Sequence, residues 1–342
     1  MHESSRELSY RRTPPEFGPT TTLQATRYVV EKVLGSGSMG IVYRARDRML
    51  GRTVAIKTIR EELISKDSEY RAYRDRFFHE AHIFGSLSHP NIVALYDVGE
   101  TDDGLPYLTM EYVPDASLGA LDRHLSLDQV IWLLAQLANA IDYAHSREIL
   151  HRDIKPTNIL LGEGEEVKIA DFGVAKVLGA EFTRSQTRFG TPGYMSPEQV
   201  LGTTLTRSSD VFSLAVVAFE LLSGRKPFPG KSVHSVLYKI VHADPILPTG
   251  LEATGLAVET WKEVFANALA KEPERRYASA SELVSELVEL CPGSWLGGLL
   301  VDGLSAEAPT FEERGAHDTL TLYASGSLRS RLADRTIKSA RR

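Results

Sequence analysis

One stretch of the chain, residues 151–173, constrains its fold and chemistry more than any other. It reads HRDIKPTNILLGEGEEVKIADFG and places Asn158 five residues, and Asp171 eighteen residues, after Asp153. Two carboxylates and one carboxamide are hard oxygen ligands and proton acceptors, which is the set needed to hold Mg²⁺ on a nucleotide and to orient a hydroxyl group. The stretch therefore indicates a site at which a metal-bound nucleotide meets a hydroxyl group.

The composition excludes several other classes of protein. The 342 residues suffice for a two-lobed enzyme with tails, and 42% hydrophobic and 25% charged residues are ordinary for a soluble globular protein. A net charge of −6 carries no nucleic-acid signature, and the single cysteine, Cys291, excludes an intrachain disulfide. No apolar run reaches the ~18 residues of a membrane span, and the polar N-terminus lacks the apolar core of a signal peptide. We therefore expect a soluble, cytoplasmic chain, which could still be one part of a longer membrane-anchored protein.

The pattern of apolar residues divides the chain into two lobes and two tails. Residues 1–26 lack periodicity and are expected to form a disordered arm, and residues 292–342 a flexible C-terminal tail. Between them, residues 27–113 hold five β-type runs and one charged helical stretch, whereas residues 114–291 show mainly helical periodicity. The β-type runs cover 28–35, 40–47, 53–59, 92–100 and 106–113; the helical stretches cover 67–87, 128–146, 210–223, 259–270 and 279–290.

Three glycines, Gly35, Gly37 and Gly40, separate the first two β-type runs. Glycine lets the backbone approach phosphate oxygens without a Cβ in the way. Alone, the motif also fits an ordinary hairpin or a dinucleotide-binding loop. A dinucleotide-binding loop needs a helix directly after the glycines, whereas the following IVYRARD is β-type. A hairpin lid over a nucleotide therefore fits better.

Taken together, the motifs resemble those of protein kinases, and most of all the bacterial Ser/Thr kinases related to the eukaryotic ones (Hanks-type). The resemblance covers about residues 28–290 and is carried by VAIK at 54–57, HPNIV at 89–93, HRDIKPTN, DFG and YMSPEQ at 194–199. It implies an α+β, two-lobed kinase fold, with a small five-stranded β lobe that carries one long helix and a large, mainly helical lobe. It also implies a role in bacterial signalling.

The resemblance implies a role for each residue of the catalytic loops. Asp153 would accept or orient the proton of the substrate hydroxyl, and Lys155 would steady the transferring phosphoryl group. Asn158 and Asp171 would hold the Mg²⁺ ions, or Mn²⁺, that bridge the ATP phosphates. Lysine at position 155 and the Gly190-Thr191 pair indicate specificity for Ser and Thr.

Lys57 matches the kinase lysine that holds the nucleotide phosphates and pairs with a glutamate on the next helix. A lysine alone on an apolar strand would more simply be a solvated edge residue. Glu80 is the expected partner, because Phe77 and Phe84 at i−3 and i+4 turn its face of the helix inward. The competing glutamates, which have charged surroundings, are Glu61, Glu62 and Glu69.

The ATP site would lie beneath the glycine hairpin. Val42, Ala55 and Leu160 would sandwich the adenine, with Met110 at the back of the pocket; for each residue alone, ordinary core packing is the simpler explanation. The complete set of expected ATP-binding residues is Leu34, Gly35, Ser36, Gly37, Ser38, Gly40, Val42, Ala55, Lys57, Met110, Glu111, Val113 and Leu160, of which Glu111 and Val113 would offer hinge backbone groups.

An activation segment is expected between Asp171 and Glu198. Thr187 is its first candidate for phosphorylation, followed by Thr183 and Ser185, and autophosphorylation is expected. Thr191 would be structural. Arg152 and Lys176 would pair with the added phosphate, whose charge is about −1.5 to −2.

Further residues are expected to have structural roles. Glu198 should meet a buried arginine, for which Arg276 is the fitting partner and Arg275 the alternative. Asp210 should accept hydrogen bonds from the backbone of the HRD residues. A column that links the lobes should consist of Phe84, Leu95, His151 and Phe172.

The substrates are expected to be proteins, without a strong preference for basic peptides. Kinases with that preference carry acidic residues at two positions that here appear to be Ser117 and Thr157, although Asp115 and Asp122 lie nearby. A pseudokinase scaffold and a small-molecule phosphotransferase are the alternative functions. The first predicts loss of Lys57, Asp153 or Asp171, and the second predicts no SPE segment.

The tails leave several kinds of partner open. Threonines in both tails, at 20–22, 310, 319 and 321, could be phosphorylated and recruit phosphothreonine-binding domains, or the tails could be inert linkers. The basic end, 329–342, could instead touch acidic lipid or nucleic acid. A kinase–kinase dimer would allow autophosphorylation in trans.

Overall fold

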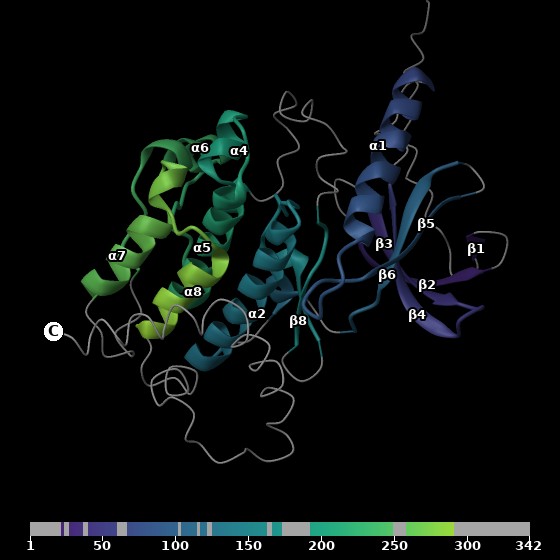
Figure 1. Cartoon of the computed structure of the whole chain (residues 1–342), viewed down its shortest axis with the longest axis horizontal. Helices are drawn as coiled ribbons and strands as arrows, with labels where there is room; N and C mark the ends of the chain where they lie inside the picture. Colours follow the sequence, from purple (N-terminus) through teal and green to yellow (C-terminus); the bar gives the residue numbers. More distant parts are fainter. Residues whose placement is uncertain are drawn as a thin grey trace, which may run out of the picture.

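The computed structural model describes residues 22–23, 27–36, 40–59, 67–101, 104–114, 117–121, 125–162, 166–172, 192–248 and 258–290. They form two lobes side by side, a β-rich lobe that carries α1 and a helical lobe built around α2 and α5 (Figure 1). The two-lobed α+β fold expected from the sequence is confirmed. Among the described residues, no helix combines the length and apolarity that a membrane crossing needs.

The small lobe is an antiparallel sheet with the strand order β1-β2-β3-β4-β6-β5. Its residues alternate between two faces, as in any strand. Val54 and Ile56 on β4 are fully buried on one face, whereas Ala55 and Lys57 lie on the other face, toward the large lobe. The elements are β1 (Thr22–Leu23), β2 (Tyr28–Ser36), β3 (Gly40–Asp47), β4 (Arg52–Ile59), α1 (Asp67–Gly85), β5 (Leu95–Glu100) and β6 (Pro106–Glu111).

Two details of this lobe differ from the expectation. The arm before residue 27 contributes strand β1, because Thr22 and Leu23 pair with Val29 and Tyr28 of β2. All five expected strands are present, and β1 adds a short sixth strand at the edge of the sheet among the described residues. Strand β5 begins at Leu95 rather than at residue 92, because residues 91–93 pair with β8 of the large lobe: Val93 N–H donates to the Ile169 carbonyl at 3.0 Å, and Ile169 N–H to the Asn91 carbonyl at 2.9 Å.

The large lobe is built around α5, whose residues from Ser209 to Phe219 are all buried. A helix that is apolar almost all round can be stable only when other elements cover it. Helix α2 begins at a capping box between Ser126 and Gln129, and α5 ends at Gly224, whose φ of 67° is in the left-handed region that favours glycine.

The helices of this lobe are α2 (Leu127–Ser146), α4 (Pro197–Leu201), α5 (Arg207–Ser223), α6 (Val233–His242), α7 (Val258–Ala268) and α8 (Ala280–Glu289). Its hairpin is formed by β7 (Ile159–Leu161) and β8 (Val167–Ile169). Short 3₁₀ turns occur at Leu118–Ala120, Pro156–Asn158, Pro192–Tyr194 and Pro273–Arg275. The four long helices were expected from the sequence, whereas α4, α6 and the hairpin were not.

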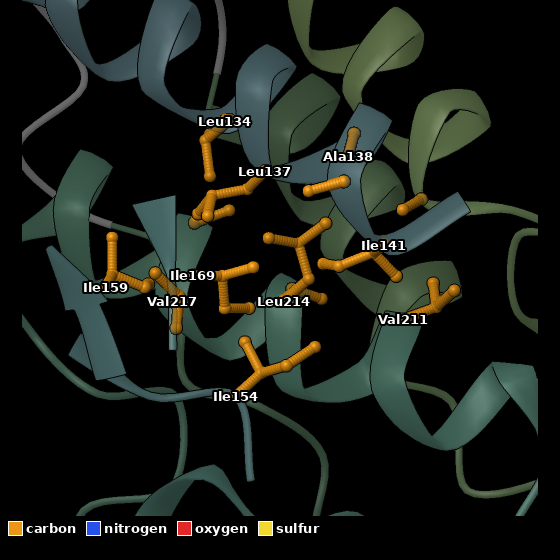
Figure 2. Packing of buried hydrophobic residues seen from close by; sticks show 14 of the residues in the cluster. Leu134, Leu137, Ala138, Ile141, Ile154, Ile159, Ile169, Val211, Leu214 and Val217 are labelled. Carbon is orange, nitrogen blue, oxygen red and sulfur yellow. The ribbon is translucent and has the colours of Figure 1, made fainter. Parts of the chain in front are cut away.

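The catalytic loop packs on the buried core of the large lobe. Figure 2 shows Ile154, Ile159 and Ile169 in one cluster with Leu137 on α2 and Leu214 on α5. Ile154 and Ile159 are 1% and 0% exposed, and they flank residues 155–158 on both sides. Close packing at both ends therefore fixes the loop against the two central helices.

Candidate active site

The catalytic loop brings Asp153, Lys155 and Asn158 together as the sequence predicts. The Lys155 ammonium lies 2.7 Å from Asp153 Oδ2. The Asn158 amide nitrogen donates both to that oxygen at 3.0 Å and to the Asp153 carbonyl at 2.8 Å. These contacts fix the Asp153 carboxylate through one oxygen, so that Oδ1 remains available to accept the proton of a substrate hydroxyl.

Asp210 holds the backbone of this loop. Its Oδ2 accepts the His151 N–H and its Oδ1 accepts the Arg152 N–H, each at 2.8 Å, and His145 Nε2 lies 2.8 Å from Oδ2. Burial alone would raise the pKa of the Asp210 carboxyl, but its contact with His145 and the backbone donors hold that pKa below its usual value. The predicted role of Asp210 is confirmed, and its carboxylate is ionised.

The anchored backbone is strained at the residue that precedes Asp153. Arg152 has a φ of 69°, in the left-handed region that non-glycine residues rarely adopt. Asp171, at the head of the second loop, has a φ of 66°. Such conformations cost about 1–3 kcal/mol each and persist where the surroundings enforce them, which is typical of functional sites.

His151 connects the two loops as a neutral ring. Burial lowers the pKa of its imidazole despite the nearby carboxylates of Asp210 and Asp153. Its Nδ1 accepts the Asp153 N–H at 3.2 Å, and its Nε2 lies 3.0 Å from the Ala170 carbonyl, which can only accept. We therefore assign the proton to Nε2. The ring thus sets the distance between Asp153 and the residue before Asp171.

Lys57 and Asp171 form an ion pair across the lobes. The lysine ammonium lies 2.7 Å from Asp171 Oδ1, and the lysine side chain is 7% exposed. Burial would raise the pKa of the Asp171 carboxyl, but Lys57 holds it below its usual value. The strand that carries Lys57 and the loop that carries Asp171 therefore meet where nucleotide phosphates would lie.

The expected ion pair between Lys57 and Glu80 is not formed. Helix α1 turns Phe77 and Phe84 inward as predicted, and both are buried, but Glu80 is only half-buried. The Lys57 ammonium forms its ion pair with Asp171 instead. With α1 in this position, Glu80 remains a predicted partner rather than an observed one.

Three rings of the expected inter-lobe column are in contact, the pair Phe84–Phe172 stacked and the pair His151–Phe172 tilted. The Phe84 and Phe172 centroids are 6.0 Å apart with the ring planes 17° from parallel, and the His151 and Phe172 centroids are 4.4 Å apart. Leu95, the fourth expected member, is half-buried against the same core. Apolar contacts therefore connect helix α1 with the loop of Asp153 and with the loop of Asp171.

The β7–β8 hairpin places the two expected metal ligands next to each other. Ile159 pairs with Ile169, and the Ala170 N–H donates to the Asn158 carbonyl at 2.8 Å, so Asn158 and Asp171 lie on adjacent ends of the hairpin. Because the Asn158 amide nitrogen is bound to Asp153, its Oδ1 is left as a ligand oxygen. Asp171 Oδ2 is not the oxygen that contacts Lys57. One carboxylate and one amide oxygen suit Mg²⁺, which takes its remaining ligands from phosphate and water.

The expected ATP pocket is lined by three strands. Across β3, Val42 pairs with Gly35 on one side and Lys57 on the other, and Ala55 of β4 pairs with Met110 of β6. The glycine segment joins strand to strand, as the hairpin interpretation predicts. Ala55, Met110 and Gly40 are buried; Val42, Glu111, Val113 and Leu160 are half-buried; Leu34, Gly35 and Ser36 are exposed; Gly37 and Ser38 lie outside the described residues.

The hinge is tied to the large lobe by contacts that the sequence did not predict. The Glu111 N–H donates to the Ala94 carbonyl at 2.8 Å, which leaves Val113 to offer a hinge N–H. The Glu111 carboxylate lies 3.1 Å from the Lys168 ammonium, which also donates to the Pro90 carbonyl at 2.7 Å. Residues 57 positions apart make this contact, and no local sequence signal indicates it.

The loop at residues 89–93 is held by a buried amide network that the sequence did not predict either. Asn91 Nδ2 donates to Gln136 Oε1 and to the Val167 carbonyl, both at 2.9 Å, and the Val167 N–H donates to Gln136 Oε1 at 3.0 Å. In the sequence, the HPNIV motif indicates the family alone. A buried asparagine without a charged partner gives no indication of where its amide binds.

The activation segment is described only at its ends. The candidates Thr187, Thr183 and Ser185 lie outside the described residues, as do Thr191 and Lys176. Arg152 Nε is buried without a hydrogen-bond partner among the residues described. This Nε–H is therefore a donor that can bind a further negative group.

Glu198 at the end of this segment pairs with Arg276, as predicted. Their closest oxygen and nitrogen lie 2.7 Å apart, and the Arg276 side chain is 0% exposed. Arg276 also donates to the carbonyls of Ala270, Ser208 and Lys271 at 2.7–3.0 Å. Arg275, the alternative, is 70% exposed and faces Glu272 at 3.6 Å.

A two-lobed fold with an anchored aspartate, and with an amide oxygen and a carboxylate oxygen on adjacent ends of a hairpin between the lobes, is typical of the protein kinase class. The model of the protein kinase domain family matches residues 28–295. The serine/threonine-protein kinase PknB of Mycobacterium leprae is 38% identical over 289 residues, covering 82% of this chain and 44% of that protein. The Mycobacterium tuberculosis PknB is 38% identical over 276 residues, covering 78% of this chain and 43% of that protein.

Solved structures lead to the same class. A crystal structure of the Mycobacterium tuberculosis PknI kinase domain matches with a TM-score of 0.62 and 26% identity, covering 80% of this chain and 99% of that one. The chain belongs to the protein kinase family, in its bacterial Hanks-type Ser/Thr branch. It spans less than half the length of the curated relatives that it matches.

The ion pair between Glu198 and Arg276 yields a stability prediction with a matched control. Arg276→Ala leaves a buried carboxylate without its partner, so we expect the free energy of unfolding to fall by about 3–5 kcal/mol. Arg275→Ala removes an exposed pair and should cost at most about 1 kcal/mol. Urea denaturation of both variants of the full chain measures the difference. Equal losses would show that the ion pair does not stabilise the large lobe.

Proposed function

We propose that this chain transfers the γ-phosphoryl group of ATP to Ser and Thr hydroxyls of proteins. The observation that carries the proposal is the convergence of Asp153, Asn158 and Asp171 with Lys57 across the two lobes. Lys57 lies 2.7 Å from Asp171, and Asn158 lies 3.0 Å from Asp153. A phosphoryl-transfer site needs positioned charges rather than covalent chemistry, and these residues supply them.

Each residue has a defined part in the transfer. Asp153 accepts the proton of the substrate hydroxyl through its uncommitted oxygen as that hydroxyl attacks phosphorus. Lys155, held against Asp153 Oδ2, lies next to the transferring group and stabilises its charge. Lys57 orients the nucleotide phosphates. Mg²⁺ or Mn²⁺, when bound by Asn158 and Asp171, would neutralise the charge of those phosphates.

A pseudokinase or a small-molecule phosphotransferase fits the site less well. The first would have lost Lys57, Asp153 or Asp171, and all three are present. The second would lack the SPE segment, whereas Glu198 of this segment is held in the core by Arg276.

The surroundings of Thr157 support a preference for substrates that are not strongly basic. The turn Leu118–Ala120 packs directly on the catalytic loop: a Cβ on Gly119 would lie 2.9 Å from Thr157 Cγ2. Ser117 also forms a β-bridge with Leu160. Neutral residues, the half-buried Ser117 and the exposed Thr157, therefore occupy the two positions at which acidic side chains would read arginines upstream of the target hydroxyl.

Several broader properties belong to the same proposal. We propose that residues 27–291 form the kinase domain, with N-lobe residues 27–113 and C-lobe residues 114–291. Protein substrates, phosphothreonine-binding partners and a transient kinase–kinase dimer fit this function. We also propose a cytoplasmic kinase domain.

The proposed role of Asp153 yields a kinetic prediction. Asp153→Asn removes the proton acceptor but keeps the shape of the side chain, so we expect incorporation of labelled phosphate from ATP into a protein substrate to fall by about 10²–10⁴-fold. ATP affinity should stay within a factor of two, because Lys57 and the pocket strands are untouched. The control is Asp75→Asn at an exposed site on α1, which should keep full activity. Undiminished transfer by Asp153→Asn would contradict the assignment.

A further prediction concerns the activation of the kinase by phosphorylation. We propose that phosphorylation at Thr187, or else at Thr183 or Ser185, switches on activity by pairing with Arg152. Tandem mass spectrometry of active protein should find phosphate on this segment, and Thr187→Ala should lower activity by at least about tenfold. Fully active protein without any phosphate between Asp171 and Glu198 would rule out this switch.

A further inference from the structure

Helix α6 buries much less of its apolar surface than its composition would lead one to expect. Six of its ten residues are apolar, yet only Ile240 is buried. Helix α8 has the same length and buries five residues. An apolar helix face that the domain itself does not cover is typical of an interaction site.

The exposed part of α6 is a stripe of rings. His234, Tyr238 and His242 are spaced at i, i+4 and i+8 and therefore share one face. Tyr238 is 66% exposed, and its ring centroid lies 4.7 Å from that of His242. Further exposed apolar side chains come from α6 and from neighbouring segments: Val233 at 39%, Leu201 at 61% on α4, which packs on α6, and Leu247 at 50%. We call these six residues the α6 surface.

The α6 surface lies in a basic segment of an acidic chain. Residues 221–243 contain Arg225, Lys226, Lys231 and Lys239 and no Asp or Glu, whereas the whole chain has a net charge of −6. Arg225 and Lys231 are exposed. Basic side chains beside exposed rings favour an acidic occupant that also carries an apolar anchor.

The helix is firmly attached to the lobe despite its exposure. The Lys271 ammonium donates to the Ile240 carbonyl at 2.7 Å and lies 4.1 Å from the centre of the Phe228 ring. The Lys239 ammonium donates to the Pro229 carbonyl at 2.5 Å. The α6 surface is therefore a preformed platform rather than a loosely packed end.

We propose that the α6 surface binds the acidic part of this chain's own C-terminal tail, residues 302–318, within the same molecule. This segment has five acidic residues and one arginine, and its large apolar residues are Leu304 and Phe311. The end of the tail has the opposite charge: residues 319–342 hold six Lys or Arg and one Asp. Residues 1–26 hold three acidic residues and three arginines. Charge complementarity thus selects 302–318 among the segments that flank the domain.

The length of the connection permits this binding. Helix α8 ends at Glu289, and it belongs to the same lobe as α6 (Figure 1). The eleven residues between Leu290 and Asp302 can span about 40 Å when extended. A lobe of about 175 residues has a radius of gyration of about 16 Å, so the tether is about as long as the lobe is wide, and the acidic segment adds its own length to that reach.

Hydrogen exchange of the full chain, followed by mass spectrometry, tests the proposal from both sides. In the wild type, amides of residues 302–318 should exchange about three- to tenfold more slowly than in the variant Tyr238→Ala, because a short tether gives an effective concentration in the millimolar range. Reciprocally, joint replacement Glu307→Gln, Glu312→Gln and Glu313→Gln should speed exchange of residues 233–242. Binding of the tail does not require phosphoryl transfer, so no kinase assay enters the test.

A matched control replaces charges elsewhere in the tail. Arg335→Gln, Arg341→Gln and Arg342→Gln together should leave both exchange rates unchanged. Exchange of residues 302–318 that is the same in wild type and Tyr238→Ala would overturn the proposal. Protection that grows with protein concentration would overturn it as well, since it would place the tail on a second molecule.

Discussion

Two backbone N–H groups of the catalytic loop converge on the Asp210 carboxylate, and the rest of the site depends on this contact. The carboxylate stands on α5, a helix buried from Ser209 to Phe219, so it has almost no freedom to move. It enforces a left-handed backbone at Arg152, and this conformation turns Asp153 toward Lys155 and Asn158. Among the described helices, the one with the largest buried share thus determines the position of the Asp153 carboxylate.

Two sets of contacts connect the anchored catalytic loop with the small lobe. One is apolar: His151 contacts Phe172, and Phe172 stacks on Phe84 of α1. The other is ionic, between Lys57 and Asp171. The ring contacts are present although Glu80 does not pair with Lys57, so they do not require that ion pair.

Local sequence patterns predicted the elements whose signals are local. The alternation in VAIK indicated the strand, and the apolar character of 210–223 indicated the buried helix α5. The spacing of Asp153, Asn158 and Asp171 indicated the site, because those residues lie in two short loops joined by one hairpin. Arg276 was preferred over Arg275, and its full burial agrees with that preference.

The misses have physical reasons as well. Strand β1 is only two residues long and forms by pairing with β2, which no periodicity reveals. The apolar spacing in α6 lies within surroundings that are basic and rich in Pro and Gly, and such surroundings favour a loop. The Lys168–Glu111 contact, the Asn91–Gln136 network and the Lys57–Asp171 pair all join distant segments of the chain. These are properties of tertiary packing.

The most direct test of the anchoring role is the kinetic effect of Asp210→Asn, measured with ATP and a protein substrate at saturation. An asparagine can accept one N–H but presents its NH₂ group to the other. We therefore predict that kcat falls by about 10²-fold through misplacement of Asp153, while the KM for ATP stays within a factor of two. The variant should melt cooperatively, so that a loss of fold is excluded. Unchanged kcat in a folded variant would contradict the central role of Asp210. A rise in the KM for ATP, as large as the predicted fall in kcat but with kcat unchanged, would contradict it as well.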